Sequence, residues 1–194
     1  GTPQDSHGSH REHFRRVRRM VKTAIDRFQQ VAPVVIPIIP GNHDLETMYY
    51  LGEALEDWYY KNAAVTVDST PILRKYHIYG VNLIGLTHGN EEKFNDLPLI
   101  MAAEAAAAWS ASVFREWHVG HFHKKKEMRY LPVDEFNGVR VRVIPSLCAA
   151  DTWHYAKGYV KGVRAAEAYL WSRDGGMVAQ YSVNVVPPTP SKEQ

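Results

Sequence analysis

The chain has 194 residues, 45% of them hydrophobic, so it can bury a core of ordinary domain size. Its formal net charge of +2, from 23 basic and 21 acidic residues, is too small to indicate nucleic-acid or membrane binding by itself. A single cysteine excludes an internal disulfide framework and no apolar stretch could span a bilayer, so we expect a cytoplasmic protein without a membrane partner.

The first predicted element is an amphipathic helix at residues 10–30. Apolar side chains recur there at three- and four-residue steps from Phe14 to Phe28. The other face is basic and carries Arg11, Arg15, Arg16, Arg18, Arg19 and Lys22. This face has two interpretations: a solvated surface with acidic partners elsewhere, or a track for the phosphates of a nucleic-acid substrate.

A buried strand is predicted at residues 34–40, where a β-branched run ends abruptly at Gly41. Asn42, His43 and Asp44 follow at once. The strand therefore delivers an amide, an imidazole and a carboxylate at its carboxyl end, which is where ligands bind in open α/β sheets. Taken alone, these residues could also form an ordinary turn, because Gly, Asn and Asp all favour turns.

The remaining elements alternate between helices and strands, which favours an α/β fold with parallel strands. They are a helix at 45–61 with Leu51, Leu55, Trp58 and Tyr59 buried, strands at 72–78 and 81–86, a helix at 97–115, a strand at 117–119, and two hairpins, 128–136 with 139–144 and 165–171 with 177–186. Asn137-Gly138 is the turn signal of the first hairpin.

Two further clusters repeat the arrangement of glycine and histidine after an apolar segment. Thr87-His88-Gly89-Asn90 follows the strand 81–86, and Gly120-His121-Phe122-His123 follows the strand 117–119. A single histidine at a strand end is usually structural, but three such clusters in one chain indicate a metal site.

The donor atoms in these clusters suit borderline divalent metals such as Mn²⁺, Fe²⁺, Zn²⁺ or Ni²⁺. Asn42 would supply an oxygen ligand, and His88 and His121 would supply nitrogen ligands. His121 and His123 lie two residues apart, so in an extended segment they point to the same side and can each bind one of two neighbouring metals. Two such metals can activate a hydroxide and clamp a phosphate ester.

His43 would lie beside these metals but is not needed as a ligand. It can donate a hydrogen bond or a proton to the leaving-group oxygen if its neighbour Asp44 holds the ring. The sequence therefore predicts His43 and Asp44 as the catalytic residues of a phosphoester hydrolase.

In this order and spacing, the three clusters resemble the last three motifs of the calcineurin-like metallophosphoesterases, and the resemblance covers residues 34–123. It implies that Asn42, His88 and His121 are ligands of the second metal and that His123 is a ligand of the first. It also implies that His43 stabilises or protonates the leaving group and that Asp44 orients it.

Two earlier motifs of that family, Asp-x-His and Gly-Asp, supply most ligands of its first metal, and neither is found. Asp5-Ser6-His7 matches the first by its letters but follows no apolar strand. We therefore expect this chain to be the carboxyl-terminal portion of a longer protein. The chain alone should bind metal weakly and hydrolyse slowly or not at all.

The resemblance implies an α/β/β/α sandwich with mixed sheets, lacking its N-terminal unit. Residues 1–186 would form a single domain and residues 187–194 a flexible tail. The expected function is a dinuclear, metal-dependent phosphoester hydrolase in which a metal-bound hydroxide attacks a phosphodiester. Mn²⁺ is the first choice, with Fe, Zn or Ni as alternatives.

The substrate class is less constrained than the reaction. The basic helix and the three lysines after His123 favour a nuclease or a nucleotide phosphodiesterase. Two alternatives stay open: a phosphatase acting on proteins or small phosphomonoesters, and a non-catalytic scaffold module with an incomplete metal site. The sequence does not indicate the oligomeric state.

Overall fold

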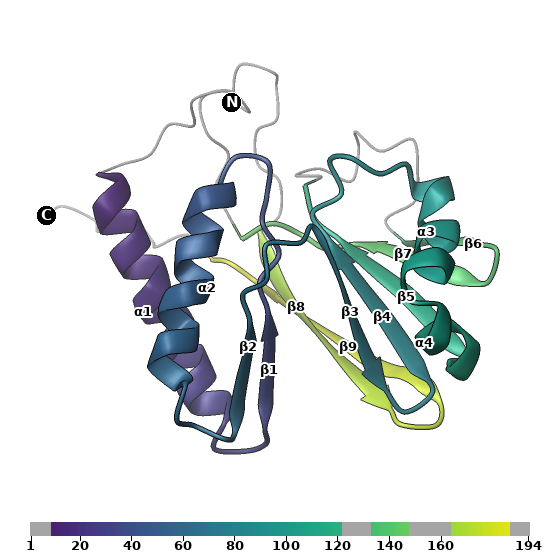
Figure 1. Cartoon of the computed structure of the whole chain (residues 1–194), viewed down its shortest axis with the longest axis horizontal. Coiled ribbons are helices and arrows are strands. Elements are labelled where there is room, and N and C mark those ends of the chain that lie inside the picture. The colour runs from purple at the N-terminus through teal and green to yellow at the C-terminus, as the bar shows by residue number, and fades with distance from the viewer. Residues whose placement is uncertain (1–8, 122–132, 148–163, 187–194) are drawn as a thin grey trace, which may run out of the picture. The chain divides into compact units, whose positions relative to one another are not determined.

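The computed structural model describes residues 9–121, 133–147 and 164–186 (Figure 1). It is a mixed α/β structure, as predicted. The chain divides into two compact units, Gly1–Lys75 with Leu86–Asn90 and Tyr76–Gly85 with Glu91–Gln194. Each unit has its own buried core. The single domain predicted over residues 1–186 stays a prediction, and the tail at 187–194 lies outside the described residues.

The first unit combines two helices with a parallel pair of strands. Its elements are α1 (His10–Phe28), β1 (Val34–Pro37), α2 (Leu45–Tyr59) and β2 (Val65–Asp68). Strands β1 and β2 pair in parallel, with α2 as the connection between them (Figure 1). The sequence pattern predicted both helices and β1 but missed β2, because four residues give too short a pattern to be recognised.

Apolar side chains from all four of these elements meet in one core. Ile25 of α1, Leu51, Leu55 and Tyr59 of α2, and Val65 of β2 are buried there. The prediction that Trp58 is buried was wrong, since its side chain is 66% exposed. Trp58 instead lies beside α1, where the Lys22 ammonium is 4.7 Å from the centre of its ring in a cation–π contact.

The start of α1 and its contact with α2 are held by polar groups. Ser9 caps α1 in a capping box with Glu12, which satisfies backbone N–H groups that the helix itself leaves without partners. The hydroxyl of Tyr59 donates to Asp26 Oδ1 over 2.6 Å. This bond joins the end of α2 to the last turns of α1.

The second unit is built on a five-stranded mixed sheet with the order β3-β4-β5-β7-β6. Its strands are β3 (Arg74–Tyr79), β4 (Asn82–Thr87), β5 (Phe114–Val119), β6 (Val133–Phe136) and β7 (Val139–Val143). Strand β7 is parallel to β5 and antiparallel to β6. The predicted hairpin at Asn137-Gly138 is confirmed, because both residues adopt positive φ angles, of 52° and 76°, as a two-residue type I′ turn requires.

The segment before β5 differs from its prediction. Instead of one helix over 97–115, the chain forms a short 3₁₀ helix, η1 (Phe94–Asp96), then α3 (Leu97–Glu104) and α4 (Ala106–Ala111), which are separated at Ala105. The helix ends early because the backbone N–H groups of Val113 and Phe114 donate to the carbonyl of Val81, which commits this stretch to the sheet. Sheet pairing therefore overrides the helix propensity of the alanine-rich segment.

Trp117 of β5 is the largest side chain buried in the second core. Its indole N–H donates to the carbonyl of Leu97 over 3.0 Å, which holds α3 against the sheet. Gly85 of β4 makes room for the ring, because a Cβ at that position would lie 2.6 Å from it.

A second antiparallel hairpin, β8 (Ala165–Ser172) with β9 (Gly176–Asn184), is confirmed around Arg173-Asp174-Gly175. Its register shifts between Leu170 and Trp171, which is the mark of a β-bulge. None of the helices in the described part of the chain is long and apolar enough to cross a membrane.

Candidate metal centre

The chain between β1 and α2 holds the first predicted cluster. Ile38 extends the pairing beyond β1, because its N–H donates to the carbonyl of Asp68 over 3.0 Å. Pro40 and Gly41 are buried, and Asn42 and His43 are exposed in the turn that follows. Asp44 is the N-cap residue of α2. Polar side chains thus follow the strand and precede the helix, as predicted. The prediction that the strand is buried was wrong, because all of Val34–Pro37 are partly or fully exposed and Val35 is 52% exposed.

A short hydrogen bond closes this turn. The N–H of Gly41 donates to Asp44 Oδ1 over 2.7 Å. The carboxylate of Asp44 therefore folds back onto the turn instead of capping the N–H groups of α2. No hydrogen bond between Asp44 and the ring of His43 is present in the described part of the chain, and the orienting role of Asp44 stays a prediction.

The second predicted cluster meets the first within the first unit, which includes Leu86–Asn90, the end of β4 and the residues after it. Strand β4 ends at Thr87, and His88 follows it with a half-buried side chain. Nε2 of His88 lies 3.0 Å from Oδ1 of Asn42, across 46 positions of sequence. The residues that follow β1 and β4 therefore lie close together, as expected if both clusters supply ligands to one metal.

Gly41 makes this convergence possible. A Cβ at Gly41 would lie 2.8 Å from Asp44 Oδ1 and 3.1 Å from Cε1 of the His88 ring. The imidazole and the carboxylate therefore both occupy the space that a side chain at Gly41 would need, and a larger residue there would displace one of them.

The Asn42–His88 pair fits two ligands of one metal. Neighbouring ligands at right angles, each about 2.1 Å from an octahedral metal, are about 3 Å apart. In this structure the 3.0 Å contact is a hydrogen bond between the imidazole and the amide oxygen. The same separation would suit two ligands of one ion, and an amide oxygen with an imidazole nitrogen suits Mn²⁺, Fe²⁺ or Zn²⁺. Among the described residues no three His, Cys, Asp or Glu side chains form a group that could hold a metal ion. The geometry is compatible with Asn42 and His88 as two ligands of one ion, and the ligand roles of all four residues stay predictions.

The third cluster is only partly described. His121 follows β5 in the second unit and adopts a positive φ of 64°, a conformation uncommon for a residue with a side chain. His123 lies outside the described residues, as does Asp5-Ser6-His7. The predicted roles of His121 and His123 as ligands stay predictions.

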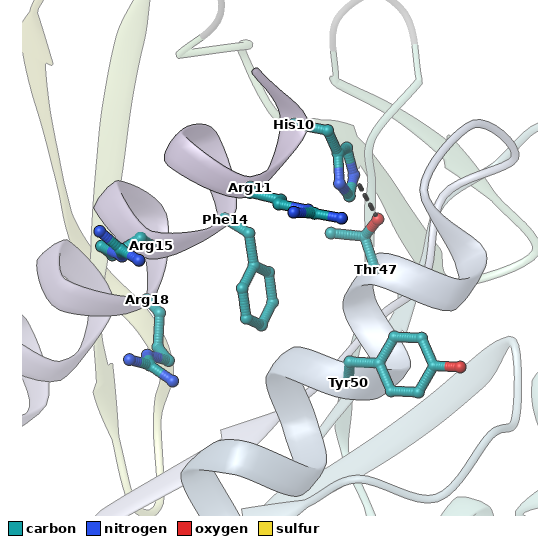
Figure 2. Close-up of a pocket in the computed structure, with 7 residues that line it drawn as sticks. All are labelled: His10, Arg11, Phe14, Arg15, Arg18, Thr47 and Tyr50. Carbon is teal, nitrogen blue, oxygen red and sulfur yellow. Dashed lines mark hydrogen bonds between the residues drawn. The ribbon is translucent and has the colours of Figure 1, made fainter. Parts of the chain in front are cut away.

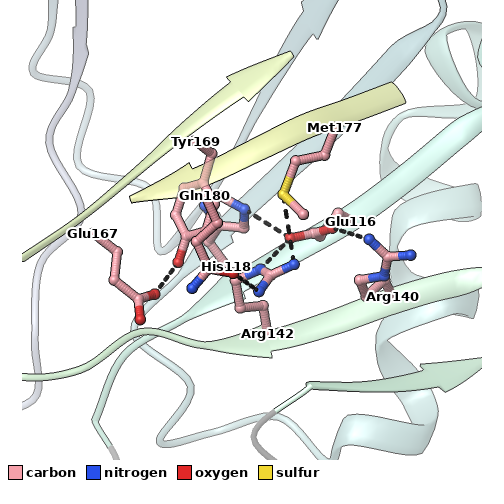
Figure 3. A network of polar contacts seen from close by, with 8 residues as sticks. All are labelled: Glu116, His118, Arg140, Arg142, Glu167, Tyr169, Met177 and Gln180. Atoms are coloured by element: carbon pink, nitrogen blue, oxygen red, sulfur yellow. Dashed lines mark hydrogen bonds and ion pairs between the residues drawn. The ribbon is translucent and has the colours of Figure 1, made fainter. Parts of the chain in front are cut away.

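The second unit contains a buried ionic network that the sequence analysis did not predict (Figure 3). Glu116 of β5, 2% exposed, accepts from Nε of the buried Arg142 over 2.5 Å and lies 3.1 Å from Nε2 of His118. Arg140 adds a longer contact at 3.4 Å. Arg142 also donates to Gln180 Oε1 over 2.9 Å, which joins β7 to β9. The sequence contained a signal for this network, because charged or polar residues alternate with apolar ones at Glu116 and His118 of β5 and at Arg140 and Arg142 of β7.

The ionisation of Glu116 is set by opposing effects. Burial opposes the charged form, but hydrogen bonds from His118 and Arg142, with the positive charge of Arg142, outweigh it. The pKa of Glu116 is therefore lowered from its usual 4.5. Because Arg142 of β7 also binds Gln180 of β9, we interpret the network as a link that holds the β8–β9 hairpin on the sheet.

Comparison with known proteins returned no match among family models, curated proteins or solved structures. The case for a metal centre therefore depends on the residues and geometry described above.

The geometry of Gly41 leads to a stability prediction. Gly41→Ala should lower the free energy of unfolding by about 1–3 kcal/mol, because the added methyl group has no room beside Asp44 and His88. Urea unfolding followed by tryptophan fluorescence measures the change. Gly175→Ala is the control, since its added methyl group meets mainly the Ser172 hydroxyl at 3.2 Å. Equal, small effects for both variants would show that the packing at Gly41 is looser than described.

Proposed function

We propose that the chain belongs to a dinuclear, metal-dependent phosphoester hydrolase of the calcineurin-like type, with the α/β/β/α sandwich of that family. The supporting observation is the 3.0 Å approach of Asn42 Oδ1 and His88 Nε2, which come from two separate motifs. Two polar side chains that meet at the ends of β1 and β4 have the donor chemistry that a divalent metal needs.

In this proposal Asn42, His88 and His121 hold the second metal, and His123 contributes to the first. Two bound divalent ions would neutralise charge on the phosphate and lower the pKa of water. The chain's own contribution is to position the ligands. Gly41 and its hydrogen bond to Asp44 fix the turn, so that the Asn42 amide oxygen faces His88.

His43 is the proposed proton donor to the leaving group. It follows Asn42 directly, and its side chain is exposed on the turn, where a substrate can reach it. An imidazole can hold a proton and deliver it to an oxygen within hydrogen-bond distance. Asp44, the next residue, is retained as the group that orients the ring when substrate is bound.

A phosphodiester, in a nucleic acid or a nucleotide, is the proposed substrate. The arginine side chains of α1 support this choice, since all six of them are exposed on this one helix. Guanidinium groups bind phosphate in pairs of parallel hydrogen bonds.

The test is Mn²⁺-dependent hydrolysis of bis-p-nitrophenyl phosphate, compared with p-nitrophenyl phosphate. It is run on this chain and, side by side, on the longest polypeptide that its gene encodes. Turnover of the diester that disappears with chelator supports the proposal. A preference for the monoester would favour a phosphatase. Absence of metal-dependent turnover in both polypeptides would favour a scaffold module and contradict the proposal.

A further inference from the structure

Helices α1 and α2 of the first unit line an open pocket of about 390 Å³ (Figure 2). This volume lies within the range of small-molecule sites. The pocket is lined by His10, Arg11, Phe14, Arg15, Arg18, Thr47 and Tyr50. Its walls thus combine three guanidinium groups with two aromatic rings and a hydroxyl, and none of these residues belongs to the candidate metal centre.

The three arginines share one face of α1. Arg11, Arg15 and Arg18 stand at steps of four and three residues, which places them on adjacent turns above one another. Lys22 continues the same row, but its ammonium is bound to Asp26 over 2.5 Å. Within the described part of the chain, no ion pair is found for the three arginines of the pocket. Their positive charge is available to a ligand.

The nearest acidic group of α1 is occupied elsewhere. The carboxylate of Glu12 accepts the backbone N–H of Ser9 over 3.0 Å as part of the capping box. Arg11 stands in the first turn of the helix, where the helix dipole disfavours a positive charge. A positive charge at this position lowers the stability of the helix. An anion bound to Arg11 would neutralise that charge and remove the unfavourable interaction with the helix dipole.

Aromatic rings complete the pocket on the other side. Tyr50 of α2 is 59% exposed, and its ring packs edge-on against Tyr49 with centres 5.7 Å apart. The ring of Phe14 lies between the arginines and α2, with the Arg18 guanidinium 6.0 Å from its centre (Figure 2). Thr47 closes one end, bound to His10 over 3.1 Å. An exposed ring beside guanidinium groups suits a ligand that is both anionic and flat.

We infer that this pocket binds a nucleotide unit, with its phosphate on the arginines and its base against Tyr50. Arginine clusters alone would also accept an acidic peptide, but the aromatic rings favour a base, because every base has a face that can stack. The inference concerns a second site and does not depend on the proposed metal chemistry. The unit can be a free nucleotide or part of a single strand, since both present the same chemistry.

The test is fluorescence anisotropy with a fluorescein-labelled oligothymidylate of about ten nucleotides, a length typical of single-strand sites. The assay contains EDTA and low salt, so that failure of the metal site cannot affect it. We expect binding by the unaltered chain. Arg15→Ala should weaken it about tenfold, as loss of a charge-assisted hydrogen bond does. The matched control Arg19→Ala removes the same charge from outside the pocket and should change affinity by about twofold or less.

A second variant separates the base from the phosphate. Tyr50→Leu should weaken oligothymidylate binding about fivefold or more through lost stacking, while displacement by inorganic tripolyphosphate is unchanged. If AMP displaces the labelled oligothymidylate, the ligand is a free nucleotide. If only unlabelled oligothymidylate displaces it, the ligand is a single strand. Both results support the inference. No binding, equal losses for Arg15→Ala and Arg19→Ala, or equal displacement by poly-glutamate would overturn it.

Discussion

His43→Asn is expected to lower turnover by about 10²–10⁴-fold, because the variant removes the group that gives a proton to the leaving oxygen. Asparagine keeps a polar side chain of similar size but cannot act as an acid. The comparison uses the polypeptide in which turnover is detected, and kcat is measured together with metal content.

Metal content distinguishes this role from that of a ligand. His43→Asn should bind as much metal as the unaltered protein, since His43 is not among the proposed ligands. His77→Asn is a matched control, because His77 is exposed on β3 and has no assigned role. Loss of metal in His43→Asn, or normal turnover, would contradict the assignment.

Glu116→Gln is expected to destabilise the chain by about 3–5 kcal/mol, which is typical of breaking a buried ion pair from one side. The substitution leaves Arg142, which is 4% exposed, without a negative partner in the core. Chemical denaturation measures the loss. Glu135→Gln, which removes an exposed carboxylate from neighbouring β6, should change stability by about 0.5 kcal/mol or less.

A double substitution tests whether the charge itself is needed. Replacing the pair with apolar residues, as in Glu116→Leu with Arg142→Met, should recover much of the lost stability, because no uncompensated charge stays buried. If the double variant is no better than Glu116→Gln, the loss comes from packing instead of charge.

The lowered pKa of Glu116 also predicts how stability varies with pH. Since the carboxyl group ionises more readily in the folded state, its contribution is fully present above its usual pKa of 4.5. It is lost as the pH falls through the lowered folded-state pKa. The free energy of unfolding should therefore fall more steeply in the unaltered chain than in Glu116→Gln as the pH falls from 4.5 to the lowered folded-state pKa. Parallel pH profiles would show that Glu116 titrates alike in both states.

Local signals explain which parts of this fold were predictable. Asn137-Gly138 predicts a tight turn from its own conformational preferences, because both residues readily adopt positive φ angles, and the prediction was correct. The contact between His88 and Asn42 agrees with the expectation that polar residues after two apolar strands lie together, while their role as ligands stays a prediction. Both predictions depended on residues whose chemistry allows few alternatives.

Other features depended on tertiary contacts that no local pattern encodes. The break at Ala105 lies in a run of alanines that favours a continuous helix, and the exposure of Trp58 depends on how α2 packs against α1. The Glu116 network requires β5 and β7 to be neighbours, which their separation in sequence does not show. The pocket at Arg15 likewise required the placement of α2 beside α1.

The central claim is that Asn42 and His88 bind the same metal ion, and the most direct test counts bound Mn²⁺ by electron paramagnetic resonance. Free Mn²⁺ gives the signal, so bound Mn²⁺ is measured as the loss of signal on adding protein. The chain and its His88→Ala variant are titrated at high protein concentration. The account predicts that the chain binds Mn²⁺ and that His88→Ala loses one equivalent, since His88 and Asn42 are ligands of the same ion. Equal Mn²⁺ binding by both proteins, or no binding by either, would contradict it.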